Sequence, residues 1–148
     1  MDERERAERG RVVAIARTWL GTPYHDHAKI KGAGVDCGQI IGATFEEAGI
    51  IDSFETGYYS PQWYMHKDGE EFVRILLSYG THEIEATDAL PGDIVVYKFA
   101  RSFAHGAIIV DPGFPRIIHA YKPAWGVIEN DGAIGPLGAR ERRFFSRW

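Results

Sequence analysis

Residues 91–121 read PGDIVVYKFARSFAHGAIIVDPGFPRIIHAY, and this stretch decides the fold class. The turn residues Pro91-Gly92-Asp93 precede an apolar run, which predicts a strand over Ile94–Tyr97. Two further apolar runs, His105–Val110 and Arg116–Tyr121, are joined by a five-residue loop that holds two prolines and a glycine. Short apolar runs separated by turn residues predict consecutive antiparallel strands.

Helical patterns occupy the part of the chain before this meander. Arg4–Leu20 carries an apolar stripe at helical spacing. A second helix is predicted to start after Asp36 as its N-cap and to stop at Gly49, and a third is predicted within Pro61–Tyr79. Further strand candidates are Val127–Glu129 and Arg143–Phe145. Helices first and strands second predict an α+β fold with N-terminal helices packed on one side of a central antiparallel sheet, and the length predicts a single domain over residues 1–148.

The composition excludes several functional classes. The 148-residue chain has a formal net charge of −4 and a pI of about 5.8, so it lacks the basic surface that binding to nucleic acid requires. No apolar run approaches the roughly 18–20 residues of a membrane span. The start, Met1–Arg6, carries both charge signs and no apolar stretch follows it, so we expect synthesis in the cytoplasm without a signal peptide.

Cys37 is the single cysteine of the chain. One cysteine cannot form an internal disulfide, and by count alone an inert buried thiol is the commoner outcome. Its predicted place, one residue after the N-cap of the second helix, changes that expectation. The dipole and the unpaired N–H groups of a helix start stabilise a thiolate, and they also stabilise the oxyanion formed when a carbonyl is attacked. The position therefore favours Cys37 as a nucleophile.

A thiol nucleophile needs a nearby base, and the base needs a partner that orients it. Two of the six histidines, His105 and His119, lie on neighbouring predicted strands. If Val110 pairs with Arg116, side-chain alternation places both imidazoles on one face as diagonal neighbours, and a register shift of two residues would place them directly opposite. A histidine on a strand is more often structural, but two on one face of one hairpin predict a Cys–His–His site.

A metal site is the alternative that the remaining histidines raise. His25 and His27 form a His-x-His pair on a loop, which is a pattern that zinc can use. The only further ligands nearby in sequence are Cys37, Asp26 and Asp36. We therefore expect no metal here, and interpret the pair as substrate contacts or surface polarity.

Four other polar residues have simple structural explanations. Tyr24 is first of all a packing aromatic, and Asp36 is first of all a helix cap, although a cap carboxylate at the edge of a site can also meet a substrate amine. His66 and His82 have the sequence surroundings of solvated positions.

Five short motifs resemble, in order, those of the NlpC/P60 family of cell-wall cysteine peptidases. They are Leu20-Gly21-Thr22-Pro23-Tyr24, Gly34-Val35-Asp36-Cys37, Pro91-Gly92-Asp93-Ile94, His105-Gly106-Ala107-Ile108 and Ile118-His119-Ala120. The resemblance covers nearly the whole chain and is closest to the short phage-encoded branch. The stretches similar to that branch are Lys31-Gly32-Ala33-Gly34, Tyr59-Ser60-Pro61-Gln62-Trp63 and His119-Ala120-Tyr121.

This resemblance implies a papain-like NlpC/P60 fold and hydrolysis of an amide in the peptidoglycan stem peptide, such as the γ-D-glutamyl bond to a diamino acid. It implies that Cys37 is the nucleophile, His105 the general base and acid, and His119 the residue that orients His105. Tyr24 and Asp36 match positions that line the pocket for the amino end of the stem. Neither a metal nor a cofactor is implied.

The resemblance also implies where such a protein acts. The phage-encoded branch is associated with phage tails, prophages and gene-transfer particles, so tail proteins are expected partners and the cell wall is the expected place of action. Gly38-Gln39 stands where many bacterial members have Ser-Gly, which leaves the bond and the stem-end preference open. Two alternatives remain: an N-acetylmuramoyl-L-alanine amidase or thiol acyltransferase on the same fold, and a structural tail-tip protein without activity.

Overall fold

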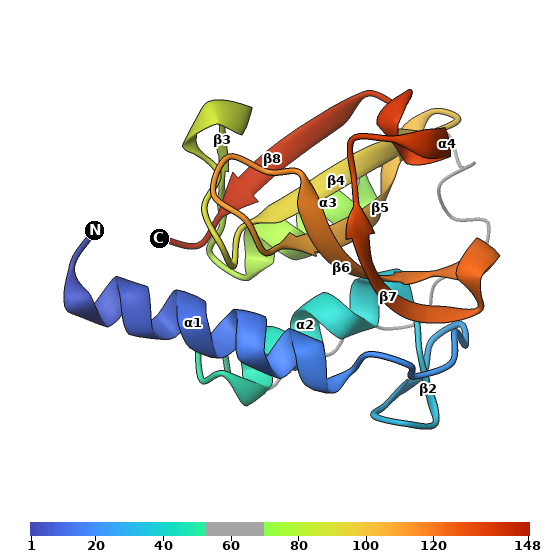
Figure 1. Ribbon diagram of the computed structural model, residues 1–148, viewed down its shortest axis with the longest axis horizontal. Coiled ribbons are helices and arrows are strands. Elements are labelled where there is room, and N and C mark those ends of the chain that lie inside the picture. Colours follow the sequence, from blue (N-terminus) through green and yellow to red (C-terminus); the bar gives the residue numbers. More distant parts are fainter. Residues whose placement is uncertain (53–69) are drawn as a thin grey trace.

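The computed structural model of the protein describes residues 1–52 and 70–148 (Figure 1). Three predicted features lie outside these ranges: the Tyr59–Trp63 motif, His66, and residues 61–69 of the third predicted helix. The described residues form an α+β fold in which helices pack against a six-stranded antiparallel sheet, as predicted.

The two helices that come first in the chain start at aspartate caps. Helix α1 spans Glu3–Thr18 and ends before the predicted Leu20; Asp2 caps it by accepting a hydrogen bond from the Glu5 N–H at 2.8 Å. Helix α2 spans Cys37–Glu47, and Asp36 caps it as predicted. The chain leaves α2 through Gly49 at φ +75°, a left-handed conformation that glycine adopts without a steric penalty.

The remaining helical segments are short. Helix α3 spans Glu71–Ser78, so the predicted third helix is confirmed over its described C-terminal part, and it buries Phe72, Val73 and Leu76. The other short segments are η2 (Ala86–Asp88), η3 (Lys122–Ala124) and α4 (Gly135–Gly138), together with the paired strands β1 (Lys29–Ile30) and β2 (Gly34–Val35). None of these short elements was predicted, because two to four residues are too few to establish a periodicity.

The main sheet has the strand order β3-β8-β4-β5-β6-β7. Its strands are β3 (His82–Ile84), β4 (Ile94–Phe99), β5 (Ser102–Ile109), β6 (Arg116–Tyr121), β7 (Gly126–Asp131) and β8 (Arg142–Ser146). All neighbouring pairs are antiparallel. The five predicted strands are confirmed within a few residues, and the edge strand β3 is the one that the sequence pattern missed.

The predicted register between β5 and β6 is confirmed. Ile108 faces Ile118 and Ile109 faces Ile117, and the Val110 N–H donates to the Arg116 carbonyl at 2.9 Å. Continued toward the open end of this hairpin, the same register brings the two histidines of the predicted site to one face as diagonal neighbours.

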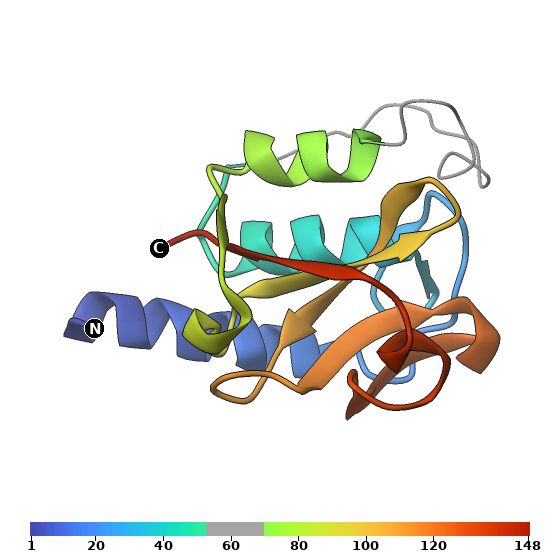
Figure 2. The same cartoon turned by 90° about the horizontal axis from the view of Figure 1, so that it is seen from above.

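The two faces of the sheet have separate apolar cores. Alternate residues such as Val96 and Ile108 pack against α1, α2 and α3, while Val95 and Ile109 face the other way, toward Leu137 of α4. Figure 2 shows α2 between α1 and α3. The sheet therefore holds α2, with Cys37 at its start, against β5 and β6.

Arg9 of α1 forms a buried ion pair with the residue before β4 and stacks on a ring at the C-terminal end. The guanidinium of Arg9 is 5% exposed and donates to the Asp93 carboxylate at 2.9 Å, and it stacks 4.3 Å from the ring of Trp148. Burial is the largest influence on Asp93 and raises the pKa of its carboxyl, while hydrogen bonds from Ser146 and from the Leu90 backbone and the charge of Arg9 oppose this.

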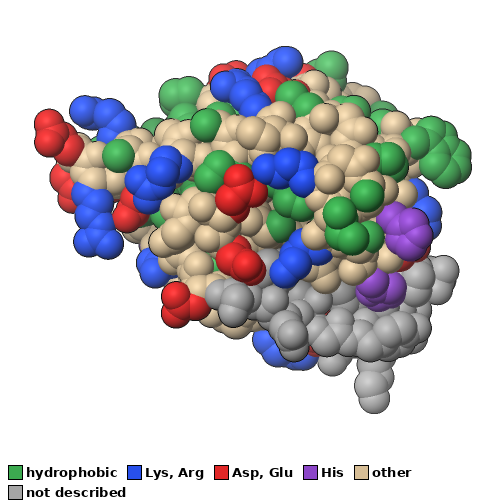
Figure 3. All heavy atoms as spheres, turned by 90° about the horizontal axis from the view of Figure 1, so that it is seen from below, with side chains coloured by type: hydrophobic (Ala, Val, Ile, Leu, Met, Phe, Trp, Pro, Cys, Tyr) green, Lys and Arg blue, Asp and Glu red, His purple; other side chains and the backbone are tan. Residues whose placement is uncertain are grey.

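The face of the molecule in Figure 3 carries Lys, Arg, Asp and Glu side chains of both signs, with hydrophobic side chains in small scattered groups. Such a mixed surface is typical of a protein exposed to water on this face. In residues 1–52 and 70–148, no helix has both the length and the apolar composition that crossing a membrane requires.

Candidate active site

Cys37 occupies the first turn of α2, at the point where the helix meets the sheet. Asp36 accepts hydrogen bonds from the N–H groups of Gly38 and Gln39 at 3.1 and 2.9 Å, which fixes the direction of the helix start. The Cys37 side chain is buried, and its Sγ–H donates to the Ala104 carbonyl at 3.7 Å. The thiol therefore contacts β5 beside His105.

The electrostatics of Cys37 differ from the sequence-based expectation. Burial raises the pKa of the thiol to about 12, and the nearby Asp36 carboxylate contributes in the same direction. Hydrogen bonds with Tyr24 and with the backbone N–H groups of Gly106 and Cys37 lower that pKa but do not offset the burial. The expected stabilisation of a thiolate by the helix start is thus outweighed, and the thiol is protonated at neutral pH.

His105 and His119 are joined directly. Nε2 of His105 lies 2.8 Å from Nδ1 of His119, and both side chains are buried. The rings meet edge to face, with centroids 5.0 Å apart. The sequence predicted either a hydrogen bond or a water bridge, and the structure shows the hydrogen bond.

A third residue, Asn130 on β7, completes this chain of side chains. Its Oδ1 lies 2.8 Å from Nε2 of His119. An amide oxygen only accepts hydrogen bonds, so Nε2 of His119 carries the proton and its Nδ1 is the acceptor. Nε2–H of His105 then donates to His119, and Nδ1 of His105 keeps a free lone pair. Asn130 therefore fixes the two tautomers, which leave Nδ1 of His105 able to accept a proton.

The sequence pattern does not identify Asn130 as a site residue. It lies one residue beyond the predicted strand Val127–Glu129, and an isolated asparagine near a strand end is more often a turn residue. The usable signal was its pairing partner, because residue 130 lies opposite Ile117 on β6, two residues from His119.

Both imidazoles are neutral at physiological pH. Burial is the largest influence on His105 and holds its pKa well below the ordinary value, and the charges of His119 and Arg140 act in the same direction. Burial lowers the pKa of His119 to about 4, although its hydrogen bond to Asn130 opposes this. A protonated thiol and a neutral imidazole are the protonation states from which general-base catalysis starts.

Tyr24 lies on the loop between α1 and β1 and reaches the thiol. Its N–H donates to the Trp125 carbonyl at 2.9 Å, which attaches this loop to the start of β7. Burial raises the pKa of its hydroxyl well above the usual range, and the nearby Cys37 and Asp36 side chains contribute in the same direction. Tyr24 is half-buried, so it forms part of the wall between the thiol and solvent.

Asp36 is 2% exposed, and both of its carboxylate oxygens take part in backbone hydrogen bonds. Besides capping α2, it accepts from the His27 N–H at 2.7 Å. The cap predicted from sequence is confirmed, and the loop that carries His27 is fixed by the same carboxylate.

The other described histidines take no part in the His105–His119–Asn130 hydrogen-bond chain. Nδ1 of His25 lies 3.1 Å from the Asp26 carbonyl on an exposed loop, and His82 is exposed on β3. Within residues 1–52 and 70–148, no group of three or more His, Cys, Asp or Glu side chains has an arrangement that could hold a metal ion.

Glycine is required beside His105. A Cβ atom on Gly106 would lie 2.5 Å from Cζ of Phe72 and 2.8 Å from Cδ1 of Ile41, closer than van der Waals contact permits. The absence of a side chain lets α2 and α3 approach β5 next to His105.

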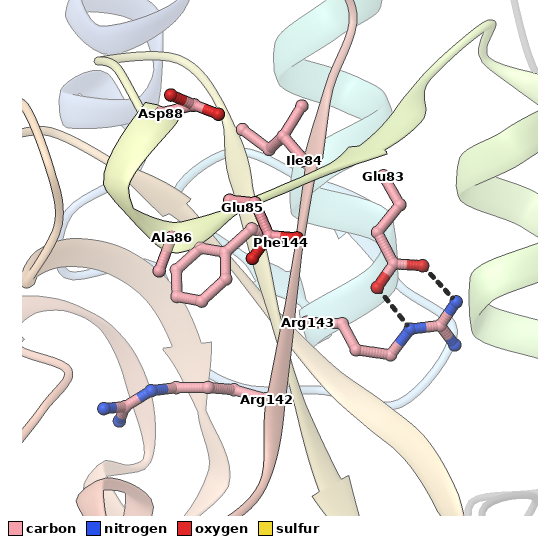
Figure 4. Close-up of a pocket in the computed structure, with 8 residues that line it drawn as sticks. All are labelled: Glu83, Ile84, Glu85, Ala86, Asp88, Arg142, Arg143 and Phe144. Carbon is pink, nitrogen blue, oxygen red and sulfur yellow. Dashed lines mark hydrogen bonds and ion pairs between the residues drawn. The ribbon is translucent and has the colours of Figure 1, made fainter.

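A cavity of about 520 Å³ lies elsewhere, between β3 and β8 (Figure 4). Glu83 accepts two hydrogen bonds from Arg143 at 2.7 and 3.0 Å, and Arg142 extends away from that pair. The cavity contains neither the thiol nor either histidine of the pair, so we place the candidate chemistry at Cys37.

Solved structures of NlpC/P60 domains share this fold. NlpC2 from Trichomonas vaginalis matches 95% of this chain with a TM-score of 0.68 and 19% identity, and the chain spans 46% of that protein. The NlpC/p60 domain of the peptidoglycan hydrolase SagA matches 91% of this chain and 96% of its own length, with a TM-score of 0.61 and 22% identity. An N-acetylmuramoyl-L-alanine amidase from Bacteroides uniformis matches 93% of this chain and 98% of its own length, with a TM-score of 0.50 and 14% identity.

Sequence comparison adds no relative: no protein-family model matches the chain, and no curated protein matches it. At these identities the structural likeness establishes the fold, which is the papain-like α+β fold of NlpC/P60 domains. A fold alone does not determine a function, which depends on the residues of the site.

Proposed function

We propose that this protein is a cysteine peptidase of the NlpC/P60 type, with residues 1–148 as one catalytic domain, that hydrolyses an amide of the peptidoglycan stem peptide. The observation that carries the proposal is the chain His105–His119–Asn130, with two 2.8 Å contacts, which starts on β5, the strand that Cys37 touches. A buried nucleophile, a base and two orienting groups in this order are the parts that acyl transfer requires.

The first step is attack by sulfur on the scissile carbonyl. In the described residues no hydrogen bond joins Cys37 to His105, so the thiol proton must turn from the Ala104 carbonyl to Nδ1 of His105. As this nitrogen takes the proton, the S–C bond forms and the carbonyl oxygen becomes an oxyanion. The Cys37 N–H at the start of α2 donates to that oxyanion.

The second step releases the amine. The imidazolium of His105 gives its proton to the leaving nitrogen, the C–N bond breaks and a thioester remains on Cys37. Water then attacks the thioester while His105 accepts a proton from it, which yields a carboxylic acid and the free thiol. His119 holds Nε2–H of His105 throughout, and no metal or cofactor takes part in this scheme.

Tyr24 and Asp36 are proposed to line the pocket for the amino end of the stem peptide. Tyr24 is the better placed of the two, because it is half-exposed and close enough to the thiol for each group to influence the pKa of the other. Both carboxylate oxygens of Asp36 already accept backbone hydrogen bonds, so only their remaining lone pairs could accept from a substrate amine. The main effect of Asp36 is therefore to hold the helix start in place.

The proposed setting follows the resemblance to the phage-encoded branch. We propose that the protein is made in the cytoplasm and acts on the cell wall as part of a phage or phage-like particle, with tail proteins as partners. The bond between a γ-D-glutamyl residue and a diamino acid is the proposed target.

A second candidate is an N-acetylmuramoyl-L-alanine amidase. The similarity in fold to such an amidase from Bacteroides uniformis supports it, and the same thiol, base and oxyanion donor would cut the sugar–peptide amide. An acyltransferase would use the same thioester and pass the acyl group to an amine in place of water.

Digestion of defined muropeptides separates these possibilities. Purified protein and its Cys37→Ala variant are incubated with them, and the products are weighed by mass spectrometry. The proposal predicts cleavage within the stem by the wild type alone. An intact stem peptide identifies the amidase, an amide-exchange product identifies the acyltransferase, and no product from a correctly folded wild type supports a structural tail-tip role.

A further inference from the structure

Arg140 is held in a fixed position on the loop between α4 and β8. Its guanidinium lies 3.6 Å from the centroid of the Phe99 ring, and its Nη1 donates to the Lys98 carbonyl at 3.0 Å. Stacking on an aromatic ring and a backbone hydrogen bond together orient the planar guanidinium at the end of the β4–β5 hairpin.

The positive charge of Arg140 has no anionic partner in residues 1–52 and 70–148. The acidic neighbour, Glu141, lies 3.6 Å from Lys98 instead. Nε of Arg140 is buried and has no hydrogen-bond partner in the described part of the chain. A part-buried guanidinium without a counter-charge is unfavourable for stability alone, so its position calls for another explanation.

Arg140 is one ring away from the proposed base. The Phe99 ring on which it stacks meets the His105 ring edge-on, with centroids 6.0 Å apart. The other groups around His105 are Tyr97 from β4 and His119 and Tyr121 from β6, and Cys37 lies on the α2 side. Unlike these groups, Arg140 carries a positive charge at every pH at which the protein is folded.

We infer that Arg140 is a specificity-determining residue that binds a carboxylate of the substrate next to the amide that is cut. The inference rests on the proposed function and adds to it a binding site for an anionic group of the substrate. In a γ-D-glutamyl amide the glutamyl residue carries a free α-carboxylate close to the scissile carbonyl. A fixed guanidinium recognises such a group through two parallel N–H···O hydrogen bonds.

This arrangement couples binding to catalysis. The charge of Arg140 contributes to the lowered pKa of His105, which makes His105 a weaker base in the free protein. A bound carboxylate offsets that charge, so the pKa of His105 rises when the acidic substrate is in place. A substrate whose carboxyl is amidated would not have this effect.

The test uses two synthetic stem peptides that differ only in the glutamyl α-carboxyl group, a free acid in one and a carboxamide in the other. Binding is measured by calorimetry on the Cys37→Ala protein, with and without Arg140→Gln, and cleavage is measured on the proteins that keep Cys37. Arg11→Gln, which removes one exposed positive charge from α1, is the matched control.

We expect the Arg140-containing protein to bind the acid peptide at least about tenfold more tightly than the amide. Arg140→Gln should abolish this preference by weakening the binding of the acid peptide alone, and in cleavage it should change KM more than kcat. It should also raise the pKa of His105 in an NMR titration. Arg140→Lys should keep part of the preference because it keeps the charge, and Arg11→Gln should keep all of it.

If Arg140→Gln weakens the binding of both peptides equally, the residue only supports the hairpin. If the preference for the acid peptide is unchanged, the carboxylate binds elsewhere. Either result overturns the inference. If neither peptide is cut but the Arg140-dependent preference in binding persists, the anion site stands and the proposed peptidase reaction fails.

Discussion

Replacing Asn130 by alanine removes the oxygen that accepts the Nε2–H of His119 at 2.8 Å. His119 is 0% exposed, so the orphaned donor has no direct access to bulk water. Leaving a buried donor unsatisfied costs about 1–3 kcal/mol. The ring also loses the contact that selects its tautomer, and in the wrong tautomer His119 cannot accept from His105. If that free energy appears in the transition state, kcat falls by about 5- to 150-fold.

The assay is steady-state hydrolysis of a defined stem peptide, with thermal unfolding as a check on the fold and ¹⁵N NMR to report which ring nitrogens carry protons. Asn130→Asp is the matched control, because it keeps an acceptor oxygen. Its negative charge should raise the pKa of His119 and move the acid limb of the pH–rate profile to higher pH. If Asn130→Ala retains the wild-type kcat and the wild-type tautomers, Asn130 does not set the tautomers of His119 and His105.

Three further predictions address the thiol, the histidines and the packing beside the base. Because the pKa of Cys37 is raised to about 12, iodoacetamide should label this thiol at pH 7–8 at least about tenfold more slowly than it labels a free thiol. The labelling rate should still be rising at pH 10. Labelling faster than that of a free thiol would contradict a buried, protonated Cys37. The pKa of His119 falls from 6.5 in the unfolded chain to about 4 in the folded protein, so stability is full above pH 6.5 and is lost as the pH falls toward 4, by about 3 kcal/mol. Urea unfolding between pH 4 and 7 checks this, and His119→Gln should flatten the dependence. Gly106→Ala should lower the free energy of unfolding by about 1–3 kcal/mol, because the new Cβ would clash with Phe72. Gly10→Ala is the control: open space surrounds Gly10 in α1, so this change should be neutral or stabilising. Equal effects of the two changes would show that Gly106 is not required for packing.

The elements with a clear periodicity could be predicted from sequence. The β5–β6 register followed from the five-residue loop and from side-chain alternation, and it places His105 and His119 on one face. The start of α2 followed from Asp36, because capping is a local interaction between near neighbours in the chain.

What could not be predicted depends on burial and on contacts between distant segments. Asn130 enters the site only through the pairing of β6 with β7. The raised pKa of Cys37 reflects the depth of the thiol beneath Tyr24 and β5, which outweighs the local dipole that the sequence reveals. The edge strand β3 has three residues and acquires its conformation from β8 rather than from its own pattern.

The central claim is that the Cys37 sulfur attacks a stem-peptide carbonyl. The most direct measurement is the intact mass of the protein when turnover of a defined stem peptide is stopped with acid within milliseconds. The account predicts a mass increase equal to the acyl part of the substrate, located on the peptide that contains Cys37, and neither adduct nor product with Cys37→Ala. Product formation by Cys37→Ala at the wild-type rate would contradict it.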